Sequence, residues 1–253
     1  MGITPLQALL LFRKQSGFIL PESLCYAGRL DPLAEGLLPI VEGKNLKLKD
    51  SILALPKLYR AEILIGASTD SGDLLGEVIA QDESVSLSAN SIKLIVENLK
   101  GEHELAMPRY NSISISRNSI IALAGSELLP EKIVRMMNCL DVVFIGQKRI
   151  LISEVLNKLL LAKERLDGNF RHETIQKSWE AVGKTKRDFE VLELEFLVTS
   201  GTYIRSLAEY MGKLLSVPTC LFSLVRERVG SFQIEDAFVL ALDEGSQTIK
   251  DRK

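Results

Sequence analysis

The sequence predicts an α+β fold in which helices flank a mixed, largely antiparallel sheet with a central cleft. Segments with the two-residue alternation of strands are interspersed with segments of helical spacing, without the regular strand-helix-strand order of a parallel sheet. Of the 253 residues, 46% are hydrophobic and 25% are charged, which is typical of a globular domain. A chain of this length buries a substantial core without disulfides or a structural metal.

Helices are predicted where caps and apolar spacing coincide. Thr4, Pro5 and Gln7 have the composition of a capping box with proline in the first turn, so a helix should begin there and end near Gly17. The segment 202–215 repeats apolar residues at the spacing of one buried helix face. The same reasoning predicts helices at 44–54, 88–99, 130–140, 151–166, 172–182 and 235–242.

Strands are predicted where apolar residues alternate or form short runs. Residues 57–66 alternate, with Tyr59 and Ala61 on one face and Arg60 and Glu62 on the other. Further strands are predicted at 37–41, at 77–80 as the partner of the first strand, at 192–198 and at 220–229, with a loop at 67–76 and irregular structure at 101–119.

Composition narrows the function classes. Three cysteines lie far apart and only two histidines are present. These numbers argue against a disulfide framework, a zinc site built from cysteines and a nucleophile activated by histidine. No segment reaches the roughly 18–20 apolar residues of a membrane span, and the start lacks a basic leader with a cleavage site. We therefore expect a cytoplasmic protein with no metal and no membrane contact. The net charge of −2 does not indicate a nucleic-acid binder, although local clusters of Lys and Arg could gather on one face.

One loop has an unusual pattern. Residues 28–40 read GRLDPLAEGLLPI, which places one carboxylate, Asp31, on a loop bounded by glycine and proline before an apolar run. Pro32 keeps Asp31 out of the helical conformation and fixes the turn behind it. Reactive groups are often held on loops above a rigid sheet, but Asp-Pro is also ordinary turn chemistry, and the residues alone favour that interpretation. Residues 69–73, TDSGD, are interpreted as a structural loop beside the cleft.

The segment 27–40, AGRLDPLAEGLLPI, resembles the motif G-x-L-D-P-x-A-x-G-x-L of the TruB-type tRNA pseudouridine synthases. Four further blocks resemble that family in its own order: KLYRAEILIGASTDSGDLLGEV, MPRYNS, TSGTYIRSLAEYMGKLL and SLVRERVGSFQIEDA. The blocks run from about Gly2 to Ala237, so the resemblance spans nearly the whole chain. It implies a pseudouridine synthase-like fold with a central catalytic cleft.

The resemblance also implies roles for individual residues. Asp31 matches the catalytic aspartate, which acts as the nucleophile, and Arg205 matches the arginine that pairs with it. Tyr59 matches the tyrosine that stacks on the flipped base and takes part in proton transfer. Tyr203 is expected to line the pocket and Leu224 to pack near the base. Taken singly, each also has a structural interpretation, Tyr59 as a core residue and Arg205 as a solvated one.

The chemistry of the reaction agrees with these roles. A guanidinium orients a carboxylate through a planar, charge-assisted fork, and an aromatic face offsets the cost of extruding a base from RNA. The rearrangement is redox-neutral, so no cofactor is expected. The sequence departs from the family where Tyr26 replaces a histidine that helps to seat the RNA loop, although a tyrosine can still stack there and Tyr26 is expected to bind the substrate. Ser114, Ser200 and Val225 replace basic residues. Weaker RNA affinity is expected as a result.

The expected function is the isomerisation of uridine to pseudouridine in tRNA, at uridine 55 of the T-loop. Two alternatives stay open: a pseudouridine synthase for another RNA, such as ribosomal RNA, and a catalytically weak protein that binds and folds tRNA. We expect a monomer with one catalytic domain over 1–245, in which 146–186 forms a helical insertion, and a polar tail at 246–253. The small C-terminal RNA-binding (PUA) domain of many relatives is not expected.

Overall fold

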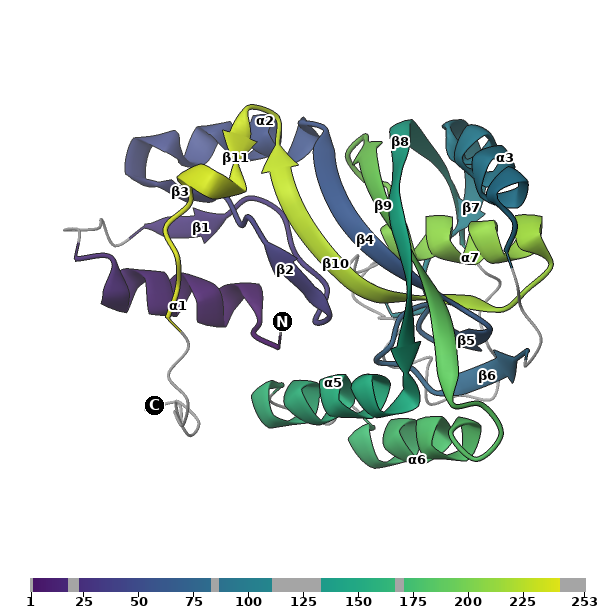
Figure 1. Cartoon of the computed structure of the whole chain (residues 1–253). Helices are drawn as coiled ribbons and strands as arrows, with labels where there is room; N and C mark the ends of the chain where they lie inside the picture. The colour runs from purple at the N-terminus through teal and green to yellow at the C-terminus, as the bar shows by residue number, and fades with distance from the viewer. Residues whose placement is uncertain (1, 18–22, 83–86, 111–132, 167–170, 242–253) are drawn as a thin grey trace.

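A seven-stranded sheet runs through the centre of the molecule (Figure 1). The computed structural model describes residues 2–17, 23–82, 87–110, 133–166 and 171–241. Along the sheet the order is β11 (Phe232–Gln233), β10 (Thr219–Val229), β4 (Lys57–Ile65), β9 (Asp188–Val198), β8 (Val134–Leu151) and β7 (Gly101–Ala106), with β2 (Ala34–Gly36) beside β10. All neighbours are antiparallel except β2, which is parallel to β10. The predicted α+β class with a mixed, largely antiparallel sheet is confirmed.

Helices and two small strand pairs surround this sheet. In Figure 1, α5 and α6 lie side by side below β8 and β9, while α3 and α7 lie beside β7. The helices are α1 (Pro5–Gln15), α2 (Lys49–Ala54), α3 (Ala89–Leu99), α5 (Ile152–Arg165), α6 (His172–Val182) and α7 (Ile204–Leu215), with 3-10 turns at Gly43–Leu48 and Ile234–Asp236. The strand pairs are β1 (Leu24–Tyr26) with β3 (Ile40–Glu42), and β5 (Ala67–Thr69) with β6 (Val78–Gln81). Within the described ranges, no helix combines the length and the apolar character needed to cross a bilayer.

Several predicted elements are confirmed together with the residues that predicted them. The hydroxyl of Thr4 accepts from the N–H of Gln7, and the Gln7 side chain accepts from the N–H of Thr4, so the capping box at the start of α1 is complete. In β4, the alternating residues Ala61 and Ile63 are fully buried. Leu64, on the other face of the strand, is also fully buried because both faces of this central strand are covered.

The helix predicted at 130–140 is wrong. From Val134 onward this segment belongs to β8, which pairs with both β7 and β9, and residues 130–132 lie outside the described residues. Residues 134–139 pair with β7, and Cys139 also pairs with Val198 of β9. This pairing outweighs the local helical spacing of the apolar residues. Successive strand residues point to opposite faces, so Met137 is 2% exposed whereas Met136 is 62% exposed.

Pairing also corrects two predictions on neighbouring segments. Residues 101–106 form strand β7, not irregular structure, because they pair along β8, while 111–119 lie outside the described residues. Strand β6 pairs with β5 and not with the strand predicted at 57–66, since β9 and β10 occupy both edges of that strand. The segment 146–186 begins inside β8 and then contains α5 and α6.

Two further predicted elements are longer than those in the structure. The apolar run 37–41 contributes only to the short strand β3 at Ile40–Glu42, because the N–H of Leu37 bonds instead to a carbonyl of β10. The helix predicted at 235–242 is limited to the 3-10 turn at Ile234–Asp236, and residue 242 lies outside the described residues.

Candidate active site

The loop that carries Asp31 is anchored to the central sheet through β2. This strand pairs in parallel with β10, with Gly36 opposite Arg226. The N–H of Ala34 donates to the carbonyl of Asp31 over 2.8 Å, which closes a tight turn ahead of the strand. Gly36 has a φ of +99°, and a Cβ there would lie 2.4 Å from the carbonyl oxygen of Arg226. Only glycine permits so close a pairing, so the backbone after Asp31 has a fixed place on the sheet.

Arg205 lies in the first turn of α7, and its guanidinium reaches Asp31. Nε donates to Oδ2 of Asp31 over 2.9 Å. Nη1 donates to the carbonyl of Ser71 over 3.0 Å, and Nη2 donates to the carbonyl of Tyr110 over 2.8 Å. The side chain of Arg205 is 3% exposed and that of Asp31 is 27% exposed. A buried guanidinium with three fixed partners therefore orients a carboxylate that solvent can still reach.

A second carboxylate, Asp73, completes this cluster. Its Oδ2 lies 3.7 Å from Nε of Arg205, and its Oδ1 accepts from the hydroxyl of Ser71 (2.8 Å) and the N–H of Leu75 (2.9 Å). Burial raises the pKa of the Asp73 carboxyl, and Arg205 opposes this shift. Burial alone would lower the pKa of Arg205, but the charges of Asp31 and Asp73 outweigh it and raise that pKa above its usual value.

Asp73 was missed as a site residue from the sequence. The segment 69–73 was interpreted as a structural loop, and part of it is one, since the hydroxyl of Thr69 donates to the carbonyl of Asp73 over 2.5 Å. The sequence alone does not show that Asp73 is buried, so nothing in it set this carboxylate apart. A buried carboxylate needs a cation as partner, and in the structure Arg205 supplies it.

The other predicted residues lie on several elements. Tyr203 is the N-cap residue of α7 and is half-buried, and burial together with the charge of Asp31 raises the pKa of its hydroxyl. Tyr59 on β4 pairs with Arg226 of β10, two residues along from Leu224. Because side chains alternate along strands, Tyr59 and Leu224 lie on the same face of the sheet. Leu224 is buried and Tyr59 is half-buried against the core.

Tyr26 lies in a separate part of the fold. It is the last residue of β1 and pairs with Ile40 of β3, in a sheet of only two strands. A short backbone segment leads from Tyr26 to Asp31, with the N–H of Ala27 bonded to the carbonyl of Pro39 over 2.8 Å. The structure thus brings Arg205 and Tyr203 to Asp31, whereas Tyr26 is connected with this cluster through the loop backbone.

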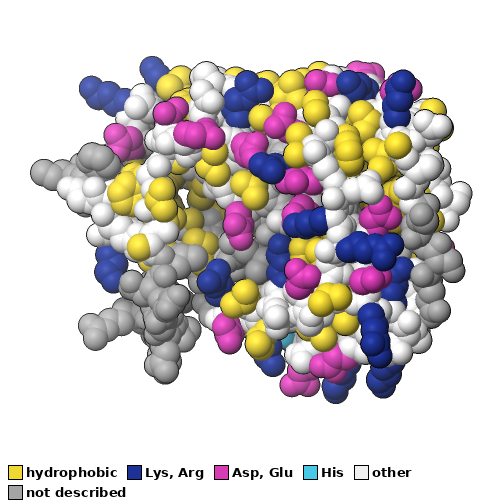
Figure 2. Space-filling view, in the orientation of Figure 1, with side chains coloured by type: hydrophobic (Ala, Val, Ile, Leu, Met, Phe, Trp, Pro, Cys, Tyr) yellow, Lys and Arg dark blue, Asp and Glu magenta, His cyan; other side chains and the backbone are white. Residues whose placement is uncertain are grey.

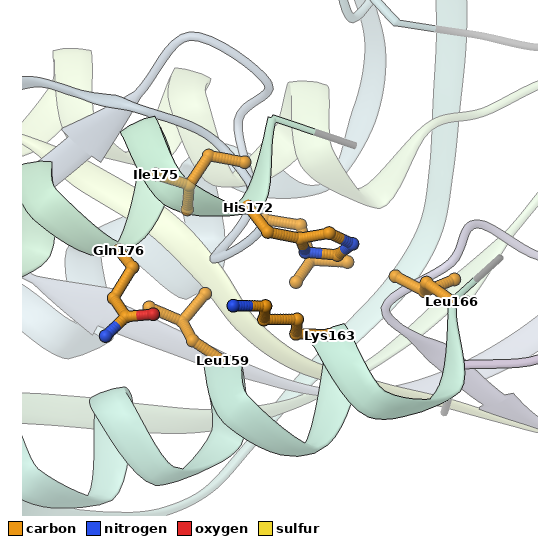
Figure 3. Close-up of a pocket in the computed structure, with 7 residues that line it drawn as sticks. Leu159, Lys163, Leu166, His172, Ile175 and Gln176 are labelled. Atoms are coloured by element: carbon orange, nitrogen blue, oxygen red, sulfur yellow. The ribbon is translucent and has the colours of Figure 1, made fainter. Parts of the chain in front are cut away.

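The small pocket in Figure 3 contains none of the predicted site residues. It lies between α5 and α6 and is lined by Leu75, Leu159, Lys163, Leu166, His172, Ile175 and Gln176. The face in Figure 2 shows Lys and Arg interspersed with Asp and Glu. Cross-strand ion pairs such as Lys148 with Glu62 join residues of opposite charge. Among the described residues, no group of three or more His, Cys, Asp or Glu side chains is arranged to hold a metal ion.

Comparison with known proteins places this chain in a family. Residues 19–153, more than half of the chain, match the model of the TruB family pseudouridylate synthase (N terminal domain). The chain belongs to the TruB family. The family indicated by the motif at 27–40 is therefore confirmed, and the match includes Asp31 and Tyr59 but not Arg205.

TruB relatives with curated names cover most of the chain. The tRNA pseudouridine synthase B of Listeria welshimeri is 27% identical over 223 residues, which are 88% of this chain and 62% of the relative. The protein of the same name from Endomicrobium trichonymphae is 27% identical over 236 residues, or 93% of this chain and 84% of the relative. The chain thus spans less than two thirds of the length of the Listeria relative.

Solved structures show the same fold. A chain in the structure of an H/ACA RNP bound to a substrate RNA containing 2'-deoxyuridine superposes with a TM-score of 0.53 at 16% identity. The likeness covers 92% of this chain and 45% of that chain. At this identity the comparison establishes the architecture, which agrees with the α+β fold seen here.

Proposed function

We propose that this TruB family chain isomerises uridine to pseudouridine in RNA, and that its target is uridine 55 in the T-loop of tRNA. The observation that carries the proposal is the bond from the buried Arg205 guanidinium to the partly exposed carboxylate of Asp31. Asp31 lies in a loop whose motif resembles that of the pseudouridine synthases, within the segment that matches the TruB family pseudouridylate synthase model. The relatives named tRNA pseudouridine synthase B support tRNA as the substrate.

In this proposal Asp31 is the nucleophile. Its carboxylate attacks the nucleoside and bonds to it covalently, and the bond from the sugar to the base nitrogen breaks. The uracil rotates, a bond from the sugar to a base carbon forms, and the bond to Asp31 breaks, which regenerates the free carboxylate. The proton on that carbon leaves and the freed nitrogen takes up a proton, so the product is an isomer of the substrate. A carboxylate nucleophile must be aimed at the atom it attacks, and the hydrogen bond from Arg205 orients the carboxylate of Asp31.

The target base must leave the RNA stack before it can react, at a cost of a few kcal/mol. The ring of Tyr59 supplies a stacking surface, which contributes roughly 1–3 kcal/mol per base, and its hydroxyl moves a proton during the rearrangement. Leu224, on the same face of the sheet, packs near the base. Tyr203, close to the charge of Asp31, lines the pocket.

A second target, a loop in another RNA such as ribosomal RNA, is favoured by the residues that replace the family's docking groups. Ser200 stands where the family has a lysine, and its hydroxyl donates to the carbonyl of Leu53, so it directs no charge toward a phosphate. Tyr26 stands where the family has a histidine. These differences predict a weaker and less salt-dependent affinity for the T-arm of tRNA.

The test is tritium release from uridine-labelled transcripts. We expect the wild-type chain to convert an unmodified tRNA transcript but not the same transcript with cytidine in place of the T-loop uridine. Asp31→Asn should fold and bind RNA without conversion. Conversion of both transcripts would reject the target, and conversion by Asp31→Asn would reject the nucleophile. Binding without conversion would favour the second target, which mapping of modified positions in total RNA would identify.

A further inference from the structure

A second buried arginine, Arg226, contacts both ends of the loop that carries Asp31. Its side chain lies on β10 and is 2% exposed. Nε donates to the carbonyl of Leu37 over 2.7 Å, and Nη1 donates to the carbonyl of Arg29 over 3.1 Å. The carbonyl of Arg226 in turn accepts from the N–H of Leu37 over 2.8 Å. One side chain therefore bonds to the backbone two residues before Asp31 and six residues after it.

Within the described part of the chain, no carboxylate forms an ion pair with Arg226, and its Nη2 is buried with no hydrogen-bond partner. The cation beside it is Lys57, whose pKa is lowered to about 8 by burial and by the charge of Arg226. A buried cation without an anionic partner is costly, and apolar side chains of similar size often stabilise a core better. Stability alone therefore does not account for an arginine at this position.

The loop backbone passes close to the guanidinium of Arg226 at Gly28. Gly28 has a φ of +103°, and a Cβ there would lie 3.6 Å from Nη1 of Arg226. The two carbonyls that Arg226 binds accept from two different nitrogens of its planar group, Nε and Nη1. A guanidinium donates along several fixed directions at once, whereas the ammonium of a lysine is a single point charge on a flexible stem. The geometry therefore uses a property that is specific to arginine.

We propose that Arg226 is a positioning residue for the reaction. It holds the carbonyls of Arg29 and Leu37 and so fixes the loop in the place where Arg205 can orient the carboxylate of Asp31. The inference rests on the proposed function, because it gives Arg226 a part in the same reaction. Arg226 acts through the loop backbone and does not touch the reacting atoms.

The test compares Arg226→Lys and Arg226→Gln with Arg228→Lys, a matched control from the same strand. Arg228 is half-buried and lies opposite Leu58 and Gln233. We expect single-turnover conversion at saturating transcript to slow by about 10²-fold in both Arg226 variants, the typical cost of a displacement of about 1 Å at a reacting group. The Kd for RNA should stay at the wild-type value, and Arg228→Lys should convert at the wild-type rate. A wild-type rate in Arg226→Lys, or a loss confined to RNA affinity, overturns the proposal.

Hydrogen exchange of the free proteins separates loop positioning from general stability. In the Arg226 variants we expect faster exchange at the amides of Ala34 and Leu37, which bond within the loop and to β10. The amides of Ile63 and Leu192, paired at the centre of β4 and β9, should keep their protection. Equal acceleration of both sets, or failure of both variants to fold, would mean that Arg226 supports the whole fold and would overturn the proposal.

Wild-type conversion, measured beside Asp31→Asn, distinguishes this inference from the proposed function. If the wild type converts the transcript and Arg226→Lys converts it equally fast, only the role of Arg226 is rejected. If the wild type does not convert the tRNA transcript, the proposed target in tRNA fails. The rates of hydrogen exchange at the amides of Ala34 and Leu37 then decide by themselves whether Arg226 fixes the loop.

Discussion

Two buried arginines hold the Asp31 loop in different ways. Arg205 faces two carboxylates, Asp31 at 2.9 Å and Asp73 at 3.7 Å. Arg226 bonds to backbone carbonyls and has another cation, Lys57, beside it. Both side chains are almost completely buried. Burial therefore does not distinguish the two arginines, but the charge of their partners does. It indicates that Arg205 orients a carboxylate, whereas Arg226 holds the loop backbone in place.

The largest effect is expected when Arg205 loses its charge. Arg205→Met leaves Asp73 buried without its cation, so we expect the free energy of unfolding to fall by about 3–5 kcal/mol at pH 7. Conversion should be lost as well, because Asp31 is no longer oriented. Denaturant unfolding and tritium release measure the two effects.

A second substitution serves as the control for Arg205→Met. Adding Asp73→Asn removes one unpaired carboxylate, and the amide oxygen can still accept from Ser71 and Leu75. The double variant should therefore regain part of the lost stability without regaining conversion. A double variant no more stable than Arg205→Met would show that Arg205 does not neutralise the charge of Asp73.

Tyr59→Phe tests whether the face of the sheet next to Arg226 also takes part in the chemistry. The ring remains available for stacking but the hydroxyl is lost. RNA affinity should stay unchanged while the single-turnover rate falls by roughly 10²–10⁴-fold, the usual range for general acid-base groups. Tyr210→Phe on α7 is the matched control and should leave the rate intact. A wild-type rate in Tyr59→Phe would limit Tyr59 to stacking and packing.

Lys57→Met tests the unbalanced charge beside Arg226 through the pH dependence of stability. The pKa of Lys57 is about 8 in the folded protein and near 10.5 in an unfolded chain. Between these values the unfolded state binds a proton that the folded state does not, so the wild type gains stability as the pH rises. Below about pH 8 the folded protein carries the full cost of the charged ammonium.

The variant lacks this titration. We therefore expect Lys57→Met to be more stable than the wild type at pH 7, and the difference to shrink steadily from pH 8 to pH 10.5. Chemical denaturation across this range measures it. A constant difference at all pH values would show that Lys57 is not held near Arg226 as a buried cation.

The smallest effect is expected for an exposed arginine with a carboxylate partner. Arg60 pairs with Glu193 across β4 and β9, and its side chain is 49% exposed. Surface pairs of this kind contribute about 0–1 kcal/mol. Arg60→Ala should therefore change the unfolding free energy by less than about 1 kcal/mol and leave conversion intact. A larger loss of either would show that exposure is a poor guide to the role of an arginine in this sheet.

Local signals predicted the elements that local interactions build. The capping box at Thr4, the alternation along β4 and the apolar face of α7 are each contained within one element, and each is confirmed. The error at β8 has the opposite origin. Residues 134–139 form a strand because β7, which lies 28 to 38 positions earlier in the chain, supplies their pairing partners.

The residues of the site divide in the same way, into those that local motifs identify and those that only the tertiary structure identifies. The order of the motifs singled out Asp31, Tyr59 and Arg205, because each motif carries its residue in a recognisable local context. The sequence did not reveal that Asp73 shares Arg205 with Asp31 or that Arg226 binds the ends of the loop. Neither Asp73 nor Arg226 stands out from its neighbours until the sheet brings distant segments together.

The sequence by itself thus determined the fold class, most helices and the loop that presents one carboxylate. The tertiary structure decided which charges face which partners. Arg205 and Asp31 are 174 positions apart, and Arg226 and Leu37 are 189 positions apart. Such contacts exist only once β2, β10 and α7 have packed, because a side chain of fixed length finds its partner through the register of the sheet and not through spacing along the chain.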